Sequence, residues 1–221
     1  MKLEVKPFPH EKLVQADDLE AFKAAFADSG VEDLMSWITA DKFDAFSWSI
    51  LHFVVGNNAL KILDWVLDEV AAVISKQSGD DKDLRNAYVK LLTTKSLDNE
   101  IPLHLAAQEG HIEIMARLLS IMEDKFAGQI ARLQCGSKNS DGSTPLLVAI
   151  EHVGGKPTEK VEKMLELLVV TGGSNLEAQD ASGMDVFGAA KFMTNRGPEI
   201  EKILRKLKRS KASKAAPRTE S

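Results

Sequence analysis

The chain has 221 residues, of which 44% are hydrophobic, 28% charged and only 6% aromatic, a composition that suits a globular protein with an aliphatic and largely helical core. It contains no run of 18 apolar residues, which argues against a membrane span, and its charged, proline-containing N-terminus does not resemble a secretion signal. The formal net charge is −5, yet residues 199–221 hold eight Lys/Arg against three Glu, so an acidic body carries a basic end and a broad nucleic-acid surface is not expected.

The first half of the chain shows helical spacing of apolar residues in several segments. Residues 17–26 and 31–38 each have the pattern of an amphipathic helix. Residues 44–55 then begin a helical unit whose second helix would bury Ile62, Val66 and Leu67. Residues 71–94 follow as helical stretches separated by the turn sequence SGDD.

The clearest pattern is the run PLHLAAQEGHIEIMARLL at residues 102–119. Pro102 suits the first turn of a helix, where its missing N–H is not needed. Gly110 suits a left-handed C-cap that reverses the chain into a second helix. The buried stripes are expected to be Leu103, Ala106 and Ala107 on the first helix and Ile114, Leu118 and Leu119 on the second.

This run resembles the ankyrin repeat, whose core reads T-P-L-H-x-A-A-x-x-G-H and continues into an apolar helix ending in L-L. Only the threonine is missing, and Ile101 stands in its place. The resemblance implies an all-α solenoid of stacked helix–turn–helix units. Each unit is preceded by a finger turn, which is the short reversal just before its first helix. The helices over 17–26 and 31–38 would then form an N-terminal helical capping segment, residues 1–40.

The same frame recurs at three other places. Residues 139–150 carry the turn and the T-P-L, residues 44–55 are a weaker copy, and residues 173–188 are a degenerate fourth copy. Leu51, Leu103, Leu146 and Phe187 mark the four frames at separations of 52, 43 and 41 residues. Because a standard repeat has about 33 residues, the excess predicts insertions. They are expected at 71–94, in a lengthened second helix over 123–136, and in a loop at 153–158 before a helix over 159–170.

These frames predict an ankyrin-repeat domain over residues 41–207, with repeats near 44–75, 96–125, 139–171 and 180–207. Ile200, Ile203, Leu204 and Leu207 have helical spacing and would close the stack. Residues 208–221, rich in Lys, Ser and Ala, are expected to be a disordered basic tail.

The candidate chemical groups favour structural roles. His52 and His104 occupy equivalent repeat positions, and the resemblance implies that they hydrogen-bond nearby turns rather than bind a metal. A zinc site would need four closely spaced ligands, which the sequence lacks. Cys135, without a positioned histidine, is expected to be a partly buried, unreactive thiol. We find no phosphate loop and no catalytic constellation, so we expect no metal, no cofactor and no enzymatic activity.

The resemblance further implies a protein partner bound in a concave groove formed by the finger turns and the outer sides of the first helices. Trp48 could be a partner anchor or a packing residue. Glu109, Asp141 and Glu151 give the groove an acidic character that suits a basic partner segment. The predicted partner-binding residues are Phe46, Trp48, Phe53, Leu97, Asp98, Leu105, Gln108, Glu109, Asn139, Asp141, Val148 and Glu151.

The expected function is that of a monomeric scaffold or adaptor. The single cysteine favours a reducing compartment, and hence the cytoplasm. Three alternatives stay open: a microbial effector or chaperone-like escort using the same surface, an enzyme with its site in the insertions, and nucleic-acid association through the basic end alone. Arg205, Lys206, Lys208 and Arg209 are either a nuclear-import patch, which would add the nucleus, or a solvated helix end.

Overall fold

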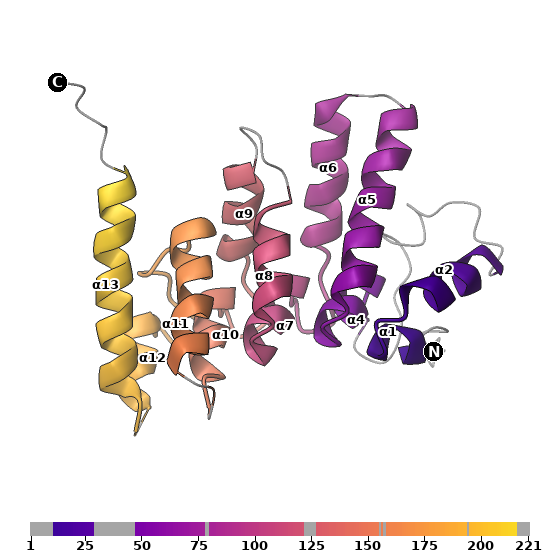
Figure 1. Ribbon diagram of the computed structural model, residues 1–221. Coiled ribbons are helices and arrows are strands. Elements are labelled where there is room, and N and C mark those ends of the chain that lie inside the picture. The colour runs from indigo at the N-terminus through magenta and orange to yellow at the C-terminus, as the bar shows by residue number, and fades with distance from the viewer. Residues whose placement is uncertain are drawn as a thin grey trace, which may run out of the picture. The chain divides into compact units, whose positions relative to one another are not determined.

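A computed structural model of the chain describes residues 11–28, 47–77, 80–121, 127–154, 156, 158–193 and 195–215. The described residues form helices and turns without a β-strand, which confirms the all-α prediction (Figure 1). The chain divides into two compact units, Met1–Ala106 and Ala107–Ser221, here called unit 1 and unit 2 and described separately.

Unit 1 contains the helix pair expected at residues 44–75 together with a third helix. Ile62, Val66 and Leu67 are completely buried, as their helical spacing predicts. The third helix runs beside the second and is fixed by the Tyr88 hydroxyl, which donates to the Leu67 carbonyl at 3.1 Å. The helices are α1 (Glu11–Gln15), α2 (Leu19–Asp28), α4 (Ile50–Gly56), α5 (Leu60–Gln77) and α6 (Asp81–Leu92), and α7 (Pro102–Glu109) crosses the boundary between the units.

The N-terminal helices pack against the first helix pair of unit 1. α2 corresponds to the helix expected over 17–26, whereas the one expected over 31–38 lies outside the described residues. Phe22 is fully buried and meets the Trp65 ring edge-on, with ring centroids 5.7 Å apart. Asp17 accepts hydrogen bonds from the backbone N–H groups of Lys61 and Ile62, and thereby caps the start of α5.

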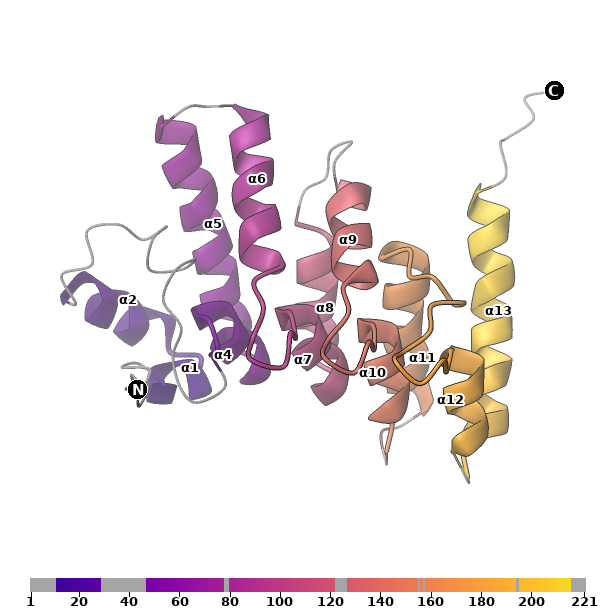
Figure 2. The same ribbon diagram turned by 180° about the vertical axis from the view of Figure 1, so that it is seen from behind.

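Unit 2 is also built of paired helices (Figure 2). Its first and second helices alternate along the chain, and their apolar faces form the core. The second helix of its middle pair ends in one turn of π-helix, η1, where the Gly172 N–H bonds to the Leu167 carbonyl at 2.8 Å. The helices are α8 (Ile112–Leu119), α9 (Ala127–Gly136), α10 (Pro145–Glu151), α11 (Thr158–Glu166), η1 (Leu167–Thr171), α12 (Val186–Phe192) and α13 (Gly197–Ala215).

The structure differs from the lengthened second helix that the sequence predicts over residues 123–136. α8 ends at Leu119 with Ser120 as its C-cap, and α9 is a separate helix that packs back against α8. The buried Gln134 amide donates to the Leu118 carbonyl at 2.9 Å, and Ile130 is buried. The apolar side of 127–136 therefore finds its partner by folding back, which a straight continuation of α8 would not provide.

The basic end also differs from the expected disordered tail, because α13 continues seven residues beyond Lys208, to Ala215. The Lys211 ammonium donates to the carbonyl oxygens of Gly173 at 2.9 Å and Ser174 at 2.7 Å, while Lys208 pairs with Glu177 at 3.1 Å. These contacts hold the last turns of the helix, and alanine supports them by its high helix propensity. Residues 216–221 lie outside the described residues.

Candidate functional site

The four finger turns share one backbone feature at one repeat position. Ser47, Asn99, Gly142 and Gly183 all have positive φ, at 55°, 58°, 75° and 83°. Their separations are 52, 43 and 41 residues, identical to those of the apolar residues that mark the four frames. In all four frames, a left-handed residue therefore stands at the same place just before the first helix.

In the turns around Asn99, Gly142 and Gly183, a short polar side chain three residues earlier holds the turn together. Asn139 Oδ1 accepts from the N–H groups of Asp141 and Ser143, at 3.1 and 2.9 Å. Asp180 Oδ1 accepts from the N–H groups of Ser182 and Met184, both at 2.8 Å. In unit 1 the Ser96 hydroxyl plays the same part for the Glu100 N–H. Such local bonds satisfy the backbone donors of the turn and fix its shape.

The two finger turns of unit 2 are joined directly. The Ala181 N–H donates to the Asp141 carbonyl at 2.8 Å, and the Lys138 ammonium donates to the Gln179 carbonyl at 2.6 Å. A β-carbon at Gly142 would lie 2.7 Å from the Ala181 nitrogen. The neighbouring turns therefore approach each other at van der Waals contact, and Gly142 is needed for that approach.

His52 and His104 bond to the turns, as the resemblance implied. His52 Nδ1 accepts from the Ser49 N–H at 3.1 Å, so Nε2 carries the proton and donates to the Glu100 carbonyl at 2.9 Å. His104 Nδ1 accepts from the Ile101 N–H at 3.2 Å. Both imidazoles are completely buried. In both imidazoles Nδ1 accepts a hydrogen bond at the start of a first helix, and Nε2 of His52 donates to the finger turn of the next frame.

An acidic cluster forms where the finger turns of unit 2 meet the end of α10. The pKa of Glu151 is raised, mainly because the carboxyl loses part of its hydration although its side chain reaches solvent, and also because Asp180 and Asp141 lie near it. His152 and a hydrogen bond with Ser143 oppose that shift. Within the described part of the chain, no lysine or arginine forms an ion pair with Asp141, Glu151 or Asp180. We call these three residues the acidic cluster.

Most of the predicted partner-binding residues reach solvent. In unit 1, Leu97 is 63% exposed and Asp98 is exposed. Whether these side chains contact a partner stays a prediction, and Phe46 lies outside the described residues. In unit 2, Glu109, Asp141 and Glu151 are exposed, and Gln108 and Asn139 are half-buried.

For three of the predicted partner-binding residues, the prediction that they lie at the surface is wrong. Phe53 and Leu105 are 6% exposed and Val148 is 2% exposed. They occupy one repeat position, the residue after the histidine of the frame, and Ala189 in the fourth frame is buried as well. The repeat pattern leaves this position variable in chemistry, but the fold uses it for packing.

Trp48 takes part in packing on α4. Its ring meets the Phe53 ring edge-on at 5.2 Å and stacks on the His52 ring at 6.3 Å. A β-carbon on Gly56 would lie 3.5 Å from the indole, which shows how closely the ring covers the end of the helix. The side chain is half-buried, so packing accounts for its position.

Two functional candidates were missed by the sequence analysis. Phe192 is 78% exposed and stands at the same repeat position as Glu151, 41 residues later, a relation that the frame spacing could have revealed. Lys156 is the second candidate, and the frame spacing gives no indication of its contacts. Its ammonium donates to the Gln108 carbonyl at 2.9 Å and to the His152 carbonyl, so one cation caps the ends of α7 and α10.

Cys135 is enclosed, and burial raises the pKa of its thiol to about 11. Ser174 and Lys211 oppose that shift. A β-carbon on Gly172 would lie 2.3 Å from the sulfur, so the site is closely packed. The structure confirms a buried cysteine.

We expect Cys135 to resist a disulfide-exchange reagent in the native protein, because the thiolate is the reacting form and little of it exists near pH 7.5. Labelling with 5,5′-dithiobis(2-nitrobenzoate), followed by absorbance, should be at least about a hundredfold slower in buffer than in urea. Equal rates in the two solvents would contradict the burial of this thiol.

The described residues hold no group of three or more His, Cys, Asp or Glu arranged to bind a metal ion. Among the helices that the structure describes, none combines the length and apolar character needed to cross a bilayer.

Comparison with known proteins agrees with the repeat geometry. A family model for ankyrin repeats (3 copies) matches residues 74–180, which hold two of the finger turns and the start of a third. No curated protein matches the chain. Ankyrin repeats are protein–protein interaction modules, and their family is generally non-enzymatic. The family match therefore identifies residues 74–180 as ankyrin repeats, and the four turns show that the same frame recurs on both sides of that segment.

Proposed function

We propose that the protein is a non-enzymatic scaffold or adaptor whose unit 2 binds a basic segment of a partner protein. The acidic cluster carries this proposal. Asp141 and Asp180 belong to adjacent finger turns, and Glu151 ends the first helix between them. The three carboxylates are close enough for the two aspartates to raise the pKa of Glu151. A bound lysine or arginine would relieve that repulsion, which gives a basic partner a specific gain at this place.

An exposed aromatic side chain adds a second element to the same surface. Phe192 ends α12 as Glu151 ends α10, and the two first helices pack against each other. Exposed aromatic rings concentrate binding energy when a partner covers them. The partner segment is therefore proposed to combine positive charge with an apolar residue. We also propose that the protein acts as a monomer in the cytoplasm.

The partner can be captured with the intact protein and with Asp141→Asn/Glu151→Gln, which keeps size and removes two charges. Asp83→Asn/Glu113→Gln is the matched control, since both of its sites are exposed and lie outside the cluster. A partner retained by the intact protein and the control, and lost by the cluster variant, supports the proposal. A partner retained equally by all three proteins places the binding surface elsewhere.

Binding of a basic peptide should depend on pH through Glu151. The pKa of this carboxyl is raised in the free protein and falls when a cation binds, so binding releases a proton. Affinity should rise with pH as the Glu151 carboxyl loses its proton, and level off above the raised pKa of Glu151, with a total change of roughly fivefold. Fluorescence anisotropy with a labelled peptide of alternating lysine and leucine measures it. Glu151→Gln should flatten the profile over the range in which the Glu151 carboxyl loses its proton in the intact protein, and an unchanged profile in this variant would contradict the assignment.

A further inference from the structure

The solvent side of α13 carries a row of four cations. Lys202, Arg205, Lys206 and Arg209 stand at i, i+3, i+4 and i+7, and all four are exposed. The opposite side of the helix buries Ile200, Ile203, Leu204 and Leu207. Because the apolar stripe is already used in packing, the row is fixed in place by the core of unit 2. We call these four residues the α13 row.

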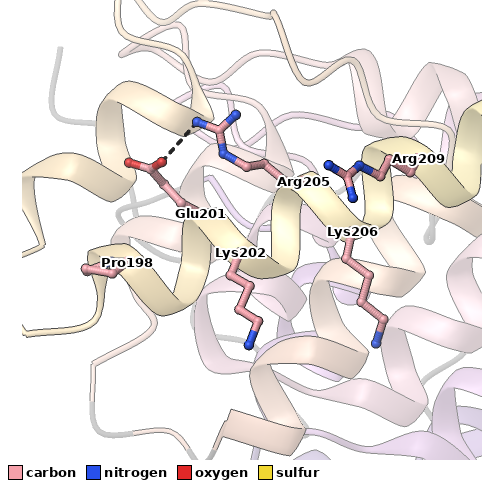
Figure 3. A pocket seen from close by; sticks show the side chains of 6 residues that line it. All are labelled: Pro198, Glu201, Lys202, Arg205, Lys206 and Arg209. Atoms are coloured by element: carbon pink, nitrogen blue, oxygen red, sulfur yellow. Dashed lines mark hydrogen bonds and ion pairs between the residues drawn. The ribbon is translucent and has the colours of Figure 1, made fainter.

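The row lies along shallow depressions in the surface (Figure 3). In one, Lys202 and Lys206 extend to the same side of α13, with Arg205 and Arg209 farther around the helix. The second is lined by Phe187 and Lys208 with the same two arginines. Arg205 and Arg209 therefore form a ridge that can be reached from both sides.

The two arginines are oriented but not fully neutralised. The Arg205 guanidinium lies 5.6 Å from the Phe187 ring centroid and pairs through one nitrogen with Glu201 at 3.2 Å. Its side chain remains 65% exposed. Among the described residues, Arg209 has no ion-pair partner. Each guanidinium thus keeps N–H donors for a further carboxylate, in the forked geometry that carboxylates accept.

The spacing of the ridge fits an extended chain. Arg205 and Arg209 are four residues apart on a helix, a rise of about 6 Å. Alternate side chains of an extended peptide are spaced about 6.6 Å apart on one side. Acidic residues at alternate positions of such a peptide would meet one arginine each, and Lys202 would supply charge beside them.

The surroundings of the row favour a short acidic segment over a long polyanion. Lys206 is paired with Glu162, with Glu166 close by, and Lys208 is paired with Glu177. Sequence-independent nucleic-acid binding gains its strength by neutralising many phosphates in series, which acidic neighbours and a net charge of −5 oppose. We infer that the α13 row docks an extended acidic peptide segment of a second partner, with carboxylates at alternate positions.

The test uses fluorescence anisotropy with a labelled ten-residue peptide of alternating aspartate and serine and the full chain, in 50 mM salt. Arg205→Gln/Arg209→Gln should weaken binding about tenfold or more. Lys61→Gln/Lys76→Gln removes the same charge from exposed sites on α5 and should leave affinity within about twofold. Arg205→Lys/Arg209→Lys should also bind several times more weakly, because lysine keeps the charge and loses the fork. Circular dichroism establishes that each variant is folded.

Several outcomes would overturn this inference. No binding by the intact protein, or equal losses in the ridge variant and in the α5 variant, would show that the row is not a docking site. Tighter binding of a twenty-nucleotide thymidine strand, lost in the ridge variant, would make it a nucleic-acid site. The intact protein could also self-associate in a concentration-dependent way in sedimentation. If the ridge variant abolished this self-association and the peptide did not, the occupant of the α13 row would be a second copy of the chain. The basic-peptide assay is separate, so either proposal can fail alone.

Discussion

Replacing Gly142 by alanine should lower the free energy of unfolding of unit 2 by about 2–4 kcal/mol. The residue has a φ of 75°, and an L side chain in this region costs about 1–2 kcal/mol. The new β-carbon would also lie 2.7 Å from the Ala181 nitrogen, so the neighbouring turn must move and its hydrogen bond to the Asp141 carbonyl must lengthen. Urea unfolding followed by circular dichroism measures the loss, and exchange of the Ala181 amide hydrogen reports the bond itself.

Gly183 offers a matched control at the same position of the next turn. Its φ is 83°, but a β-carbon there would have no heavy atom within 4 Å. Gly183→Ala should therefore cost only the conformational part, about 1–2 kcal/mol. Gly183→Asn should cost less, since Asn99 occupies this conformation naturally. Equal losses for alanine at 142 and at 183 would mean that the approach of the two turns contributes nothing.

Replacing His52 by leucine should destabilise unit 1 by about 2–4 kcal/mol. The imidazole is buried, and its removal leaves the Ser49 N–H without its ring partner, while the Glu100 carbonyl loses one of two bonds and keeps the Ser96 N–H at 2.9 Å. Each unsatisfied buried group costs about 1–3 kcal/mol. Because all three tryptophans, Trp37 included, lie in unit 1, tryptophan fluorescence during urea unfolding reports the change in that unit.

The exposed His152 is the control for this substitution. His152→Leu removes one bond at the surface end of α10 and should change stability by less than about 0.5 kcal/mol. The same proteins test the structural role of His52 against metal binding. If zinc raised the melting temperature of the intact protein and not that of His52→Leu, the imidazole would be a metal ligand.

The sequence predicted well those features that depend on neighbours within one repeat. The apolar spacing of residues 102–119 predicts burial correctly, since each stripe is completed by residues three or four positions away. The roles of Gly110 and of the finger turns follow from backbone conformations that few residues adopt.

The features that sequence reasoning missed depend on contacts distant along the chain. The return of α9 onto α8 requires the Gln134 bond to the Leu118 carbonyl, and α13 continues past Lys208 because Lys211 reaches residues 173 and 174. The burial of Leu105 and Val148 also escaped the repeat pattern, which identifies positions of constant chemistry and says little about variable ones that are covered. Such contacts have no local signature.

The finger turns keep one construction although the chain between them varies by eleven residues. α6, α9 and the loop at 153–158 absorb the difference in length, and all three begin only after a first helix has been completed. Insertion or deletion of residues at these places therefore leaves the structure of each finger turn unchanged. The segments after a first helix can change in length while the finger turns are under separate selection. For the same reason, a reporter domain inserted at the α5–α6 connection should be tolerated.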